Sequence, residues 1–197
     1  MRVFVAVDVG DAVRGEVTRV VTTLTGKLEA VKTPPKVVWV KPAALHVTIR
    51  FIGEVEPPEV ERLQELLMPP IDVAPFELEW RGIGTFPNNK HPRALWLGVR
   101  KGADAVLALQ QRLAARLHEV GVAAEDRAFT PHLTLARWRG RGGRSSERPR
   151  DLDVPRTSVA TAEVAAVTLF QSRLASQGPA YTVLAESPLV GPNLPQH

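Results

Sequence analysis

Two four-residue stretches of the chain share one pattern of residue types. Residues 46–49 read HVTI and residues 132–135 read HLTL, so each has a histidine, an apolar residue, a threonine and a second apolar residue. From the composition, a given histidine begins this pattern by chance in about 1% of cases, and two matches among the five histidines have odds of roughly one or two in a thousand. The repeated pattern, here called the HxTx motif, predicts that both stretches serve one site.

Paired histidines suit acid–base chemistry near neutral pH. A neutral imidazole takes a proton while a second, protonated imidazole gives one up. Attack of water on a phosphodiester uses both steps, because a base activates the water and an acid protonates the departing alkoxide. The hydroxyls of Thr48 and Thr134 are suited to hydrogen-bond the non-bridging oxygens as charge builds up. We expect no metal, because a third histidine or carboxylate at a recognisable spacing is missing.

Each motif is predicted to lie on a β-strand, which fixes the direction of its side chains. Because the side chains of a strand alternate between its two faces, the histidine and threonine of each motif share a face. Arg50 falls on the face of His46 and is a candidate phosphate ligand. Arg137 falls on the face opposite His132, so it reaches the site only through a twist or bulge. Solvated surface roles explain either arginine about as well.

The rest of the chain alternates between strand-like and helix-like segments. Helices are predicted at 11–28, with Asp11 as N-cap, at 59–68 and at 101–120, where apolar residues recur at helical spacing. Strands are predicted at 2–8, 37–40, around 46, at 76–80, at 94–100, around 132, at 162–170 and at 181–186, and a turn at 82–89. Long helices among hairpin-like strands predict an α+β fold with mainly antiparallel sheets.

Length and composition narrow the class of protein. The 197 residues suffice for one core or for two small lobes that share one, and 44% hydrophobic with 23% charged residues is typical of globular proteins. No run approaches the ~18 apolar residues of a membrane span, and the N-terminal stretch does not fit a signal peptide, so we expect a cytoplasmic protein. The net charge of +4 mildly favours an anionic partner.

Other nucleophile chemistries find no support in the sequence. The chain has no cysteine, which excludes a thiolate nucleophile and disulfides. It also lacks the GxSxG elbow of serine hydrolases and the GxxxxGK[ST] loop of P-loop enzymes.

The residues around both motifs resemble a known family. The segments that carry the resemblance are RVFVAVDV at the start, VVWVKPAALHVTIRFIGEV around the first motif, GIGTFPNNKHPRALWLGV in the middle, FTPHLTLARW at the second motif and VTLFQSRLASQGPAYTVL near the end. They are similar to the 2H phosphoesterase superfamily and, more narrowly, to the bacterial and archaeal RNA 2′,3′-cyclic phosphodiesterases, also called 2′-5′ RNA ligases. The resemblance covers nearly the whole chain up to about Glu186.

The resemblance implies a bilobal α+β fold with outer helices and a central cleft between two mainly antiparallel sheets, each carrying one HxTx strand. It also implies hydrolysis of RNA 2′,3′-cyclic phosphate ends to 2′-phosphomonoesters without metal or cofactor, with 2′-5′ ligation as a reverse reaction. By this resemblance His46 donates a proton to the leaving 3′ oxygen and His132 is the base that activates water. The residues alone leave that direction open.

The same resemblance sets the expected boundaries and partners. We expect residues 1–186 to form one bilobal domain whose lobes are not contiguous segments, followed by a proline-rich tail at 187–197. The expected partner is RNA with a 2′,3′-cyclic phosphate end, and we expect a monomer without a membrane partner. The alternatives are a 2H phosphoesterase acting on small cyclic nucleotides or 2′-5′ oligonucleotides, and a non-catalytic RNA- or nucleotide-binding module.

Two further features are interpreted as secondary. Phe86 lies in a turn-rich segment where a ring can stack on a base, although packing is the commoner use of such a ring. The arginine-rich segment 139–150 departs from the family's compact stretch and fits either a solvated loop or an arm for longer RNA. If it is an arm, its deletion flattens the salt dependence of RNA binding, whereas an unchanged salt slope rejects the idea.

Overall fold

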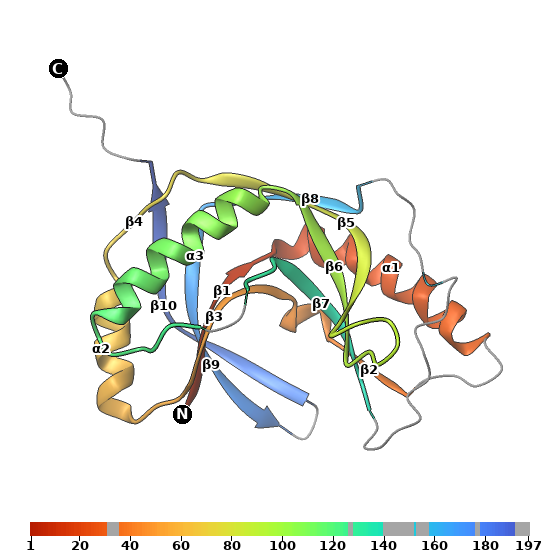
Figure 1. Ribbon diagram of the computed structural model, residues 1–197, viewed down its shortest axis with the longest axis horizontal. Coiled ribbons are helices and arrows are strands. Elements are labelled where there is room, and N and C mark those ends of the chain that lie inside the picture. Colours follow the sequence, from red (N-terminus) through yellow and green to blue (C-terminus); the bar gives the residue numbers. More distant parts are fainter. Residues whose placement is uncertain (31–35, 126–127, 140–151, 153–157, 176–177, 192–197) are drawn as a thin grey trace.

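A computed structural model describes residues 1–30, 36–125, 128–139, 152, 158–175 and 178–191 (Figure 1). In chain order the elements are β1 (Arg2–Asp8), α1 (Gly10–Glu29), β2 (Val37–Trp39), the 3₁₀ turn η1 (Pro42–Ala44), β3 (His46–Glu54), α2 (Pro57–Leu67), β4 (Ile71–Asp72), β5 (Phe76–Phe86), β6 (Ala94–Lys101), α3 (Ala103–His118), β7 (His132–Trp138), β8 (Ala160–Val164), β9 (Ala166–Ala175) and β10 (Gly178–Val190). The arginine-rich residues 140–150 lie outside the described residues.

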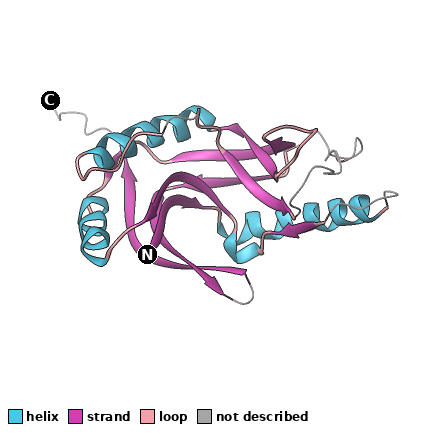
Figure 2. Cartoon of the chain, turned by 60° about the horizontal axis from the view of Figure 1, so that its bottom comes forward, coloured by secondary structure: helices cyan, strands magenta, loops and turns pink. Residues whose placement is uncertain are grey.

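The strands form two five-stranded sheets, and the helices lie around them (Figure 2). The first sheet has the order β3-β1-β9-β10-β4 and the second the order β2-β7-β6-β5-β8. All neighbouring strands are antiparallel except β10 and β4. The predicted α+β architecture with mainly antiparallel sheets is confirmed, and the two HxTx strands β3 and β7 belong to different sheets.

Each long helix covers the sheet to which its preceding strand does not belong. The helix α1 follows β1 of the first sheet but packs against β8 of the second, whereas α3 follows β6 of the second sheet and packs against β3 and β4 of the first. Figure 1 shows α1 on one side of the molecule and α3 with α2 on the other. Because the helices cross in this way, the two sheets share one hydrophobic core.

The apolar stripes of the long helices explain this packing. Val13, Val17, Leu24 and Leu28 of α1 and Val106, Leu109, Leu113 and Leu117 of α3 are all buried. They recur at intervals of three, four and seven residues, which places each set on one helical face. No helix within the described residues is both long and apolar enough to cross a bilayer.

Three local expectations differ from the structure. Asp11 does not cap α1, which begins at Gly10 without a side-chain cap; its carboxylate instead accepts a hydrogen bond from Arg14 at 2.9 Å. The expected turn at 82–89 begins later, because β5 continues to Phe86. Residues 187–190, which were expected in the tail, belong to β10, which runs to Val190 and pairs with both β9 and β4.

Candidate active site

The two HxTx strands carry the same irregularity at the same place. In β3 the pairing with β1 shifts by one residue, so that Ile49 has no partner in β1. In β7 the pairing with β6 shifts in the same way, so that Leu135 has no partner in β6. A bulge reverses the alternation of side chains beyond it. The fifth residue after each histidine, Phe51 in β3 and Arg137 in β7, therefore faces the same side as that histidine.

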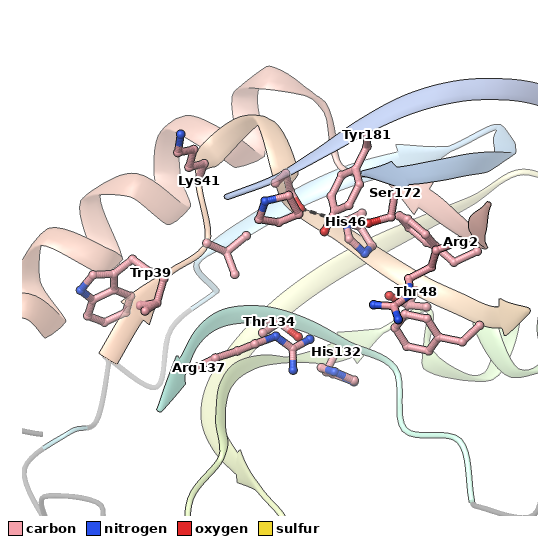
Figure 3. A pocket seen from close by; sticks show the side chains of 16 residues that line it. Arg2, Trp39, Lys41, His46, Thr48, His132, Thr134, Arg137, Ser172 and Tyr181 are labelled. Atoms are coloured by element: carbon pink, nitrogen blue, oxygen red, sulfur yellow. Dashed lines mark hydrogen bonds between the residues drawn. The ribbon is translucent and has the colours of Figure 1, made fainter. Parts of the chain in front are cut away.

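These side chains meet in one cavity of about 350 Å³ (Figure 3). It is lined by Arg2, Phe4, Val38, Trp39, Val40, Lys41, Ala44, His46, Thr48, Phe51, His132, Thr134, Arg137, Ser172, Pro179 and Tyr181. The strands β3 and β7 contact each other beside it. The structure thus brings together the histidine and the threonine of both motifs, as the repeated pattern predicts.

Both imidazoles are held in the same way by the backbone before their strand. The Nδ1 atom of His46 lies 2.9 Å from the carbonyl oxygen of Ala44, and Nδ1 of His132 lies 2.7 Å from that of Thr130. A carbonyl oxygen only accepts, so Nδ1 carries the hydrogen in each ring. In the neutral ring Nε2 is then the basic nitrogen, and among the described residues no group bonds to either Nε2 atom.

Aromatic rings pack against each imidazole. The ring of His46 lies 4.8 Å from that of Phe4 and 5.2 Å from that of Tyr181, measured between centroids. The ring of His132 lies 4.9 Å from that of Phe86 and 6.1 Å from that of Trp96. These contacts restrict the rotation of both imidazoles and keep water from one side of each ring.

Burial changes the protonation of both histidines. Desolvation lowers the pKa of His46 from its usual 6.5 to about 4; the hydrogen bond to Ala44 opposes the shift and the charge of Arg137 adds to it. Desolvation likewise lowers the pKa of His132. The hydrogen bond to Thr130 opposes this shift, and the charge of Arg137 adds to it. Both imidazoles are therefore neutral at pH 7 in the free protein, and a bound anion raises their pKa values.

A network from α1 supports the segment that leads into β3. The guanidinium of Arg14 pairs with Asp8, the residue opposite His46 in the β1–β3 register, and donates to the carbonyl of Pro42 at 3.2 Å. Pro42 begins the turn whose last residue, Ala44, accepts the hydrogen bond of the imidazole. The helix thus helps to position the first histidine.

Because of the bulges, the two arginines face the opposite sides from those that strict alternation predicts. Arg137 lines the cavity, because the bulge in β7 turns its side chain to the face of His132. Without such a bulge, strict alternation would have placed it on the opposite face. Arg50 lies beyond the bulge of β3, on the face away from the cavity, where it donates to the carbonyl of Ala123. Its Nη1 lies 3.3 Å from a carboxylate oxygen of Glu125, an ion pair without hydrogen-bond geometry. The expectation that Arg50 faces the site is wrong.

Phe86 supports His132 without lining the cavity. Its ring also lies 5.1 Å from that of Trp96. Trp96 in turn lies flat on Gly84, where an added Cβ would come within 2.0 Å of the indole ring. A glycine is needed there so that the indole can approach the backbone of β5 and pack beside the imidazole.

Several lining residues escaped prediction from the sequence. Phe51 was hidden by the bulge, while Trp39, Lys41 and Tyr181 come from strands and turns whose position beside the cavity depends on the tertiary fold. One signal was available for Arg137: two consecutive apolar residues, Leu135 and Ala136, precede it, and both are buried. Such a pair within an alternating strand indicates a change of phase.

The donor groups of the cavity do not assemble into a metal site in the part of the chain that the structure describes. There, no three histidine, cysteine, aspartate or glutamate side chains gather closely enough to hold a metal ion. The arrangement instead offers two Nε2 atoms, two threonine hydroxyls and one guanidinium around a common space. This set of groups is suited to bind an oxyanion and to move protons on either side of it.

Comparisons with known proteins identify the family of this chain. A sequence profile of the 2′-5′ RNA ligase superfamily matches residues 12–173. The RNA 2′,3′-cyclic phosphodiesterase of Archaeoglobus fulgidus is 33% identical over 185 residues, which cover 92% of this chain and 96% of the relative. The protein of the same name from Methanothermobacter thermautotrophicus is 32% identical over 183 residues, which cover 92% and 95%.

Solved structures show the same fold. The crystal structure of TT0787 of Thermus thermophilus matches with a TM-score of 0.69 at 28% identity, over 98% of this chain and 100% of that one. The crystal structure of E. coli LigT complexed with 3′-AMP matches in fold with a TM-score of 0.70 at 24% identity, over 95% and 97% of the two chains. By its sequence profile and its relatives, the chain belongs to the 2′-5′ RNA ligase superfamily.

Proposed function

We propose that this protein hydrolyses RNA 2′,3′-cyclic phosphate ends to 2′-phosphomonoesters by two-histidine acid–base catalysis. The observation that carries the proposal is the pair of HxTx strands, which come from different sheets and present two histidines with the same Nδ1 anchoring to one cavity. The names of the relatives from Archaeoglobus and Methanothermobacter support the substrate class.

In the proposed reaction Nε2 of His132 takes a proton from water, whose oxygen attacks the phosphorus. The bond from phosphorus to the 3′ oxygen breaks, and protonated His46 gives its proton to that oxygen. Each of these proton transfers contributes on the order of 10²–10⁴ in rate. The assignment of acid and base follows the family resemblance, since the anchoring of the two rings is nearly symmetric.

The other polar groups of the cavity act on the phosphate. The hydroxyls of Thr48 and Thr134 donate to the non-bridging oxygens, and the guanidinium of Arg137 balances the charge that develops on them. The phosphate anion also raises the pKa of the neighbouring imidazole that must be protonated. In this way substrate binding itself prepares the acid.

The proposed substrate determines the remaining expectations. We propose that the protein acts in the cytoplasm and that it acts as a monomer. Support for the monomer is that one chain provides all the groups of the site named above. Size-exclusion chromatography with light scattering would check it, and a dimer at assay concentrations would contradict it.

The substrate class is tested with a labelled RNA oligonucleotide that ends in a 2′,3′-cyclic phosphate, incubated with the protein in EDTA. We expect a single product that co-migrates with the 2′-phosphate standard and not with the 3′-phosphate. A mononucleoside 2′,3′-cyclic phosphate and a 3′,5′-cyclic nucleotide are compared in parallel. The proposal would be contradicted if the 3′,5′-cyclic nucleotide were turned over faster than the 2′,3′-cyclic substrates, or if activity appeared only with added metal.

A further inference from the structure

The two histidines are anchored alike, but the residues opposite them in the neighbouring strands differ. In the β1–β3 register His46 is opposite Asp8, whereas in the β6–β7 register His132 is opposite Gly98. Opposite residues of antiparallel strands share a face, with Cα atoms about 4.5–5.5 Å apart. A carboxylate therefore stands beside the first imidazole, and no side chain stands at the equivalent place beside the second.

The place opposite His132 leaves little room for a side chain. A Cβ added to Gly98 would lie 3.1 Å from the carbonyl oxygen of Arg81 and 3.2 Å from the ring of Trp96. The first of these contacts is with the backbone of β5, so a carboxylate at this position would push against the neighbouring strand. The difference between the two histidines is thus built into the packing of the second sheet.

Asp8 and the first imidazole also share a second cavity, of about 240 Å³. His46, Ala44 and Tyr181 line both this cavity and the active-site cavity, so the imidazole lies at the boundary between the two. The ring of Tyr181 stands edge-on to the imidazole there (Figure 3). Asp8 and Glu186 line the second cavity, which the other HxTx histidine does not reach.

Arg14 holds the carboxylate of Asp8 without cancelling the charge of the cluster. Its guanidinium pairs with both Asp8 and Asp11, so one cation is shared between two anions and the three side chains keep a net negative charge. Nδ1 of His46 is bonded to the carbonyl of Ala44. The carboxylate therefore acts on the imidazole through its charge and not through a hydrogen bond.

Of the charged groups near the two histidines, a carboxylate acts only on the first. Burial has the largest effect on the pKa of His46 and lowers it. Among the charged groups, Arg137 and His132 lower this pKa and Asp8 raises it. At His132 burial and Arg137 lower the pKa, and no carboxylate among the described residues raises it. The charged and titratable side chains that line the two cavities are Arg2, Asp8, Arg14, Lys41, His46, His132, Arg137, Tyr181 and Glu186.

We propose that Asp8, held in place by Arg14, is a positioning residue whose charge supports the protonated His46 that delivers a proton to the leaving 3′ oxygen. The inference rests on the proposed function. Burial works against a charged imidazole, and the nearby anion offsets part of that cost. The carboxylate itself transfers no proton: the proton of His46 goes to the 3′ oxygen, and His132 holds the one taken from water. A carboxylate beside only one of the two histidines fits a division of roles in which that histidine is the acid.

The test compares two substrates that differ in one atom. One is a nucleoside 2′,3′-cyclic phosphate, and in the other sulfur replaces the bridging 3′ oxygen. A thiolate leaves without being protonated, so the second substrate needs no acid. In Asp8→Asn we expect kcat/KM at pH 8 to fall about three- to tenfold with the oxygen substrate, because one pKa unit is tenfold in the protonated fraction. With the sulfur substrate it is expected to stay within about twofold of wild type, since no acid is required.

Titration of the two imidazoles by NMR gives a second readout, with inorganic phosphate bound. In Asp8→Asn the pKa of His46 is expected to be lower than in wild type by about half a unit to one unit, the shift that corresponds to the loss of rate. The pKa of His132 is expected to stay unchanged. A merely structural role of Asp8 would not produce a shift confined to one histidine.

Asp11→Asn is the matched control, because it removes an equal charge from the same guanidinium at a fully exposed side chain outside both cavities. Its rates are expected to stay within about twofold of wild type, since water screens an exposed charge. Asp8→Glu keeps the charge and is expected to retain most of the rate. Asp8→Ser, which removes the charge with a smaller side chain, keeps the test open if Asp8→Asn fails to fold.

The outcomes separate the two proposals. Equal losses on the oxygen and sulfur substrates, no loss on either, or an unchanged titration of His46 overturns the role of Asp8 and leaves the proposed function intact. A wild-type protein that hydrolyses neither cyclic substrate in EDTA overturns the proposed function itself.

Discussion

Each imidazole of the cavity is anchored through Nδ1 to a carbonyl two residues before it, so only Nε2 is available for proton transfer. Anchoring of this kind selects one tautomer and fixes the orientation of the ring. Desolvation by burial then lowers the pKa of both histidines. In the free protein both groups are therefore neutral, although the proposed reaction requires one base and one acid.

The lowered pKa values predict a kinetic pH profile. The free enzyme is competent only with one imidazole neutral and the other protonated. Because the pKa of His46 is about 4 and that of His132 is below 6.5, the competent fraction decreases as pH rises above both. We therefore expect kcat/KM to fall about tenfold per pH unit above pH 7, with kcat shifted to higher pH because bound phosphate raises the pKa of the acid. A value of kcat/KM that increases from pH 6.5 to 8.5 would contradict this.

The charge of Arg137 is predicted to act on both the substrate and the histidines. In Arg137→Gln we expect kcat/KM to fall about 10²-fold, because a donor to the developing charge is lost. The falling limb of the pH profile moves to higher pH, since the charge that lowers the pKa of both histidines is removed. Arg139→Gln is the control, because it removes an equal charge just beyond β7 at a residue that does not line the cavity. Equal losses in both variants would argue against a specific role.

At the scale of elements, the period of the strands was predictable and their bulges were not. Alternation correctly placed the histidine and threonine of each motif on one face, because no irregularity intervenes between them. Beyond Ile49 and Leu135 the alternation of side chains reverses. As a result Phe51, and not Arg50, lines the cavity, and Arg137 also faces it. Neither bulge contains a glycine or proline, so local propensity gives little warning.

Arg50 is predicted to stabilise the fold and not to bind substrate. Its buried guanidinium ties β3 to residues 123–125, which lie between α3 and the second HxTx strand. In Arg50→Met the carbonyl of Ala123 and the carboxylate of Glu125 lose this partner, so the free energy of unfolding should decrease by about 1–3 kcal/mol. Urea denaturation measures it, with the exposed Arg100→Met as control, for which a change within about 0.5 kcal/mol is expected. Unchanged stability with a loss of kcat/KM would instead support phosphate binding.

At the scale of the whole molecule, the site exists only because two sheets share one core. The sequence predicted the element types, the α+β class and the family, since these depend on local periodicity and on motifs. It did not predict that α1 would cover the second sheet and α3 the first, because which sheet a helix covers depends on long-range packing. The same limitation hid Trp39 and Tyr181, which join the cavity from distant parts of the chain.

Catalysis by the two histidines is tested by the hydrolysis rate of an RNA 2′,3′-cyclic phosphate end in EDTA, measured for wild type, His46→Ala, His132→Ala and the double variant. Tm and the affinity for a 2′-phosphorylated product serve as controls for folding and binding. We expect the rate to fall at least ~10²-fold in each single variant and hardly further in the double variant, because the two residues act as a unit. A single variant whose rate stays within about tenfold of wild type would contradict two-histidine catalysis and favour a protein that uses its histidines only to bind nucleotides.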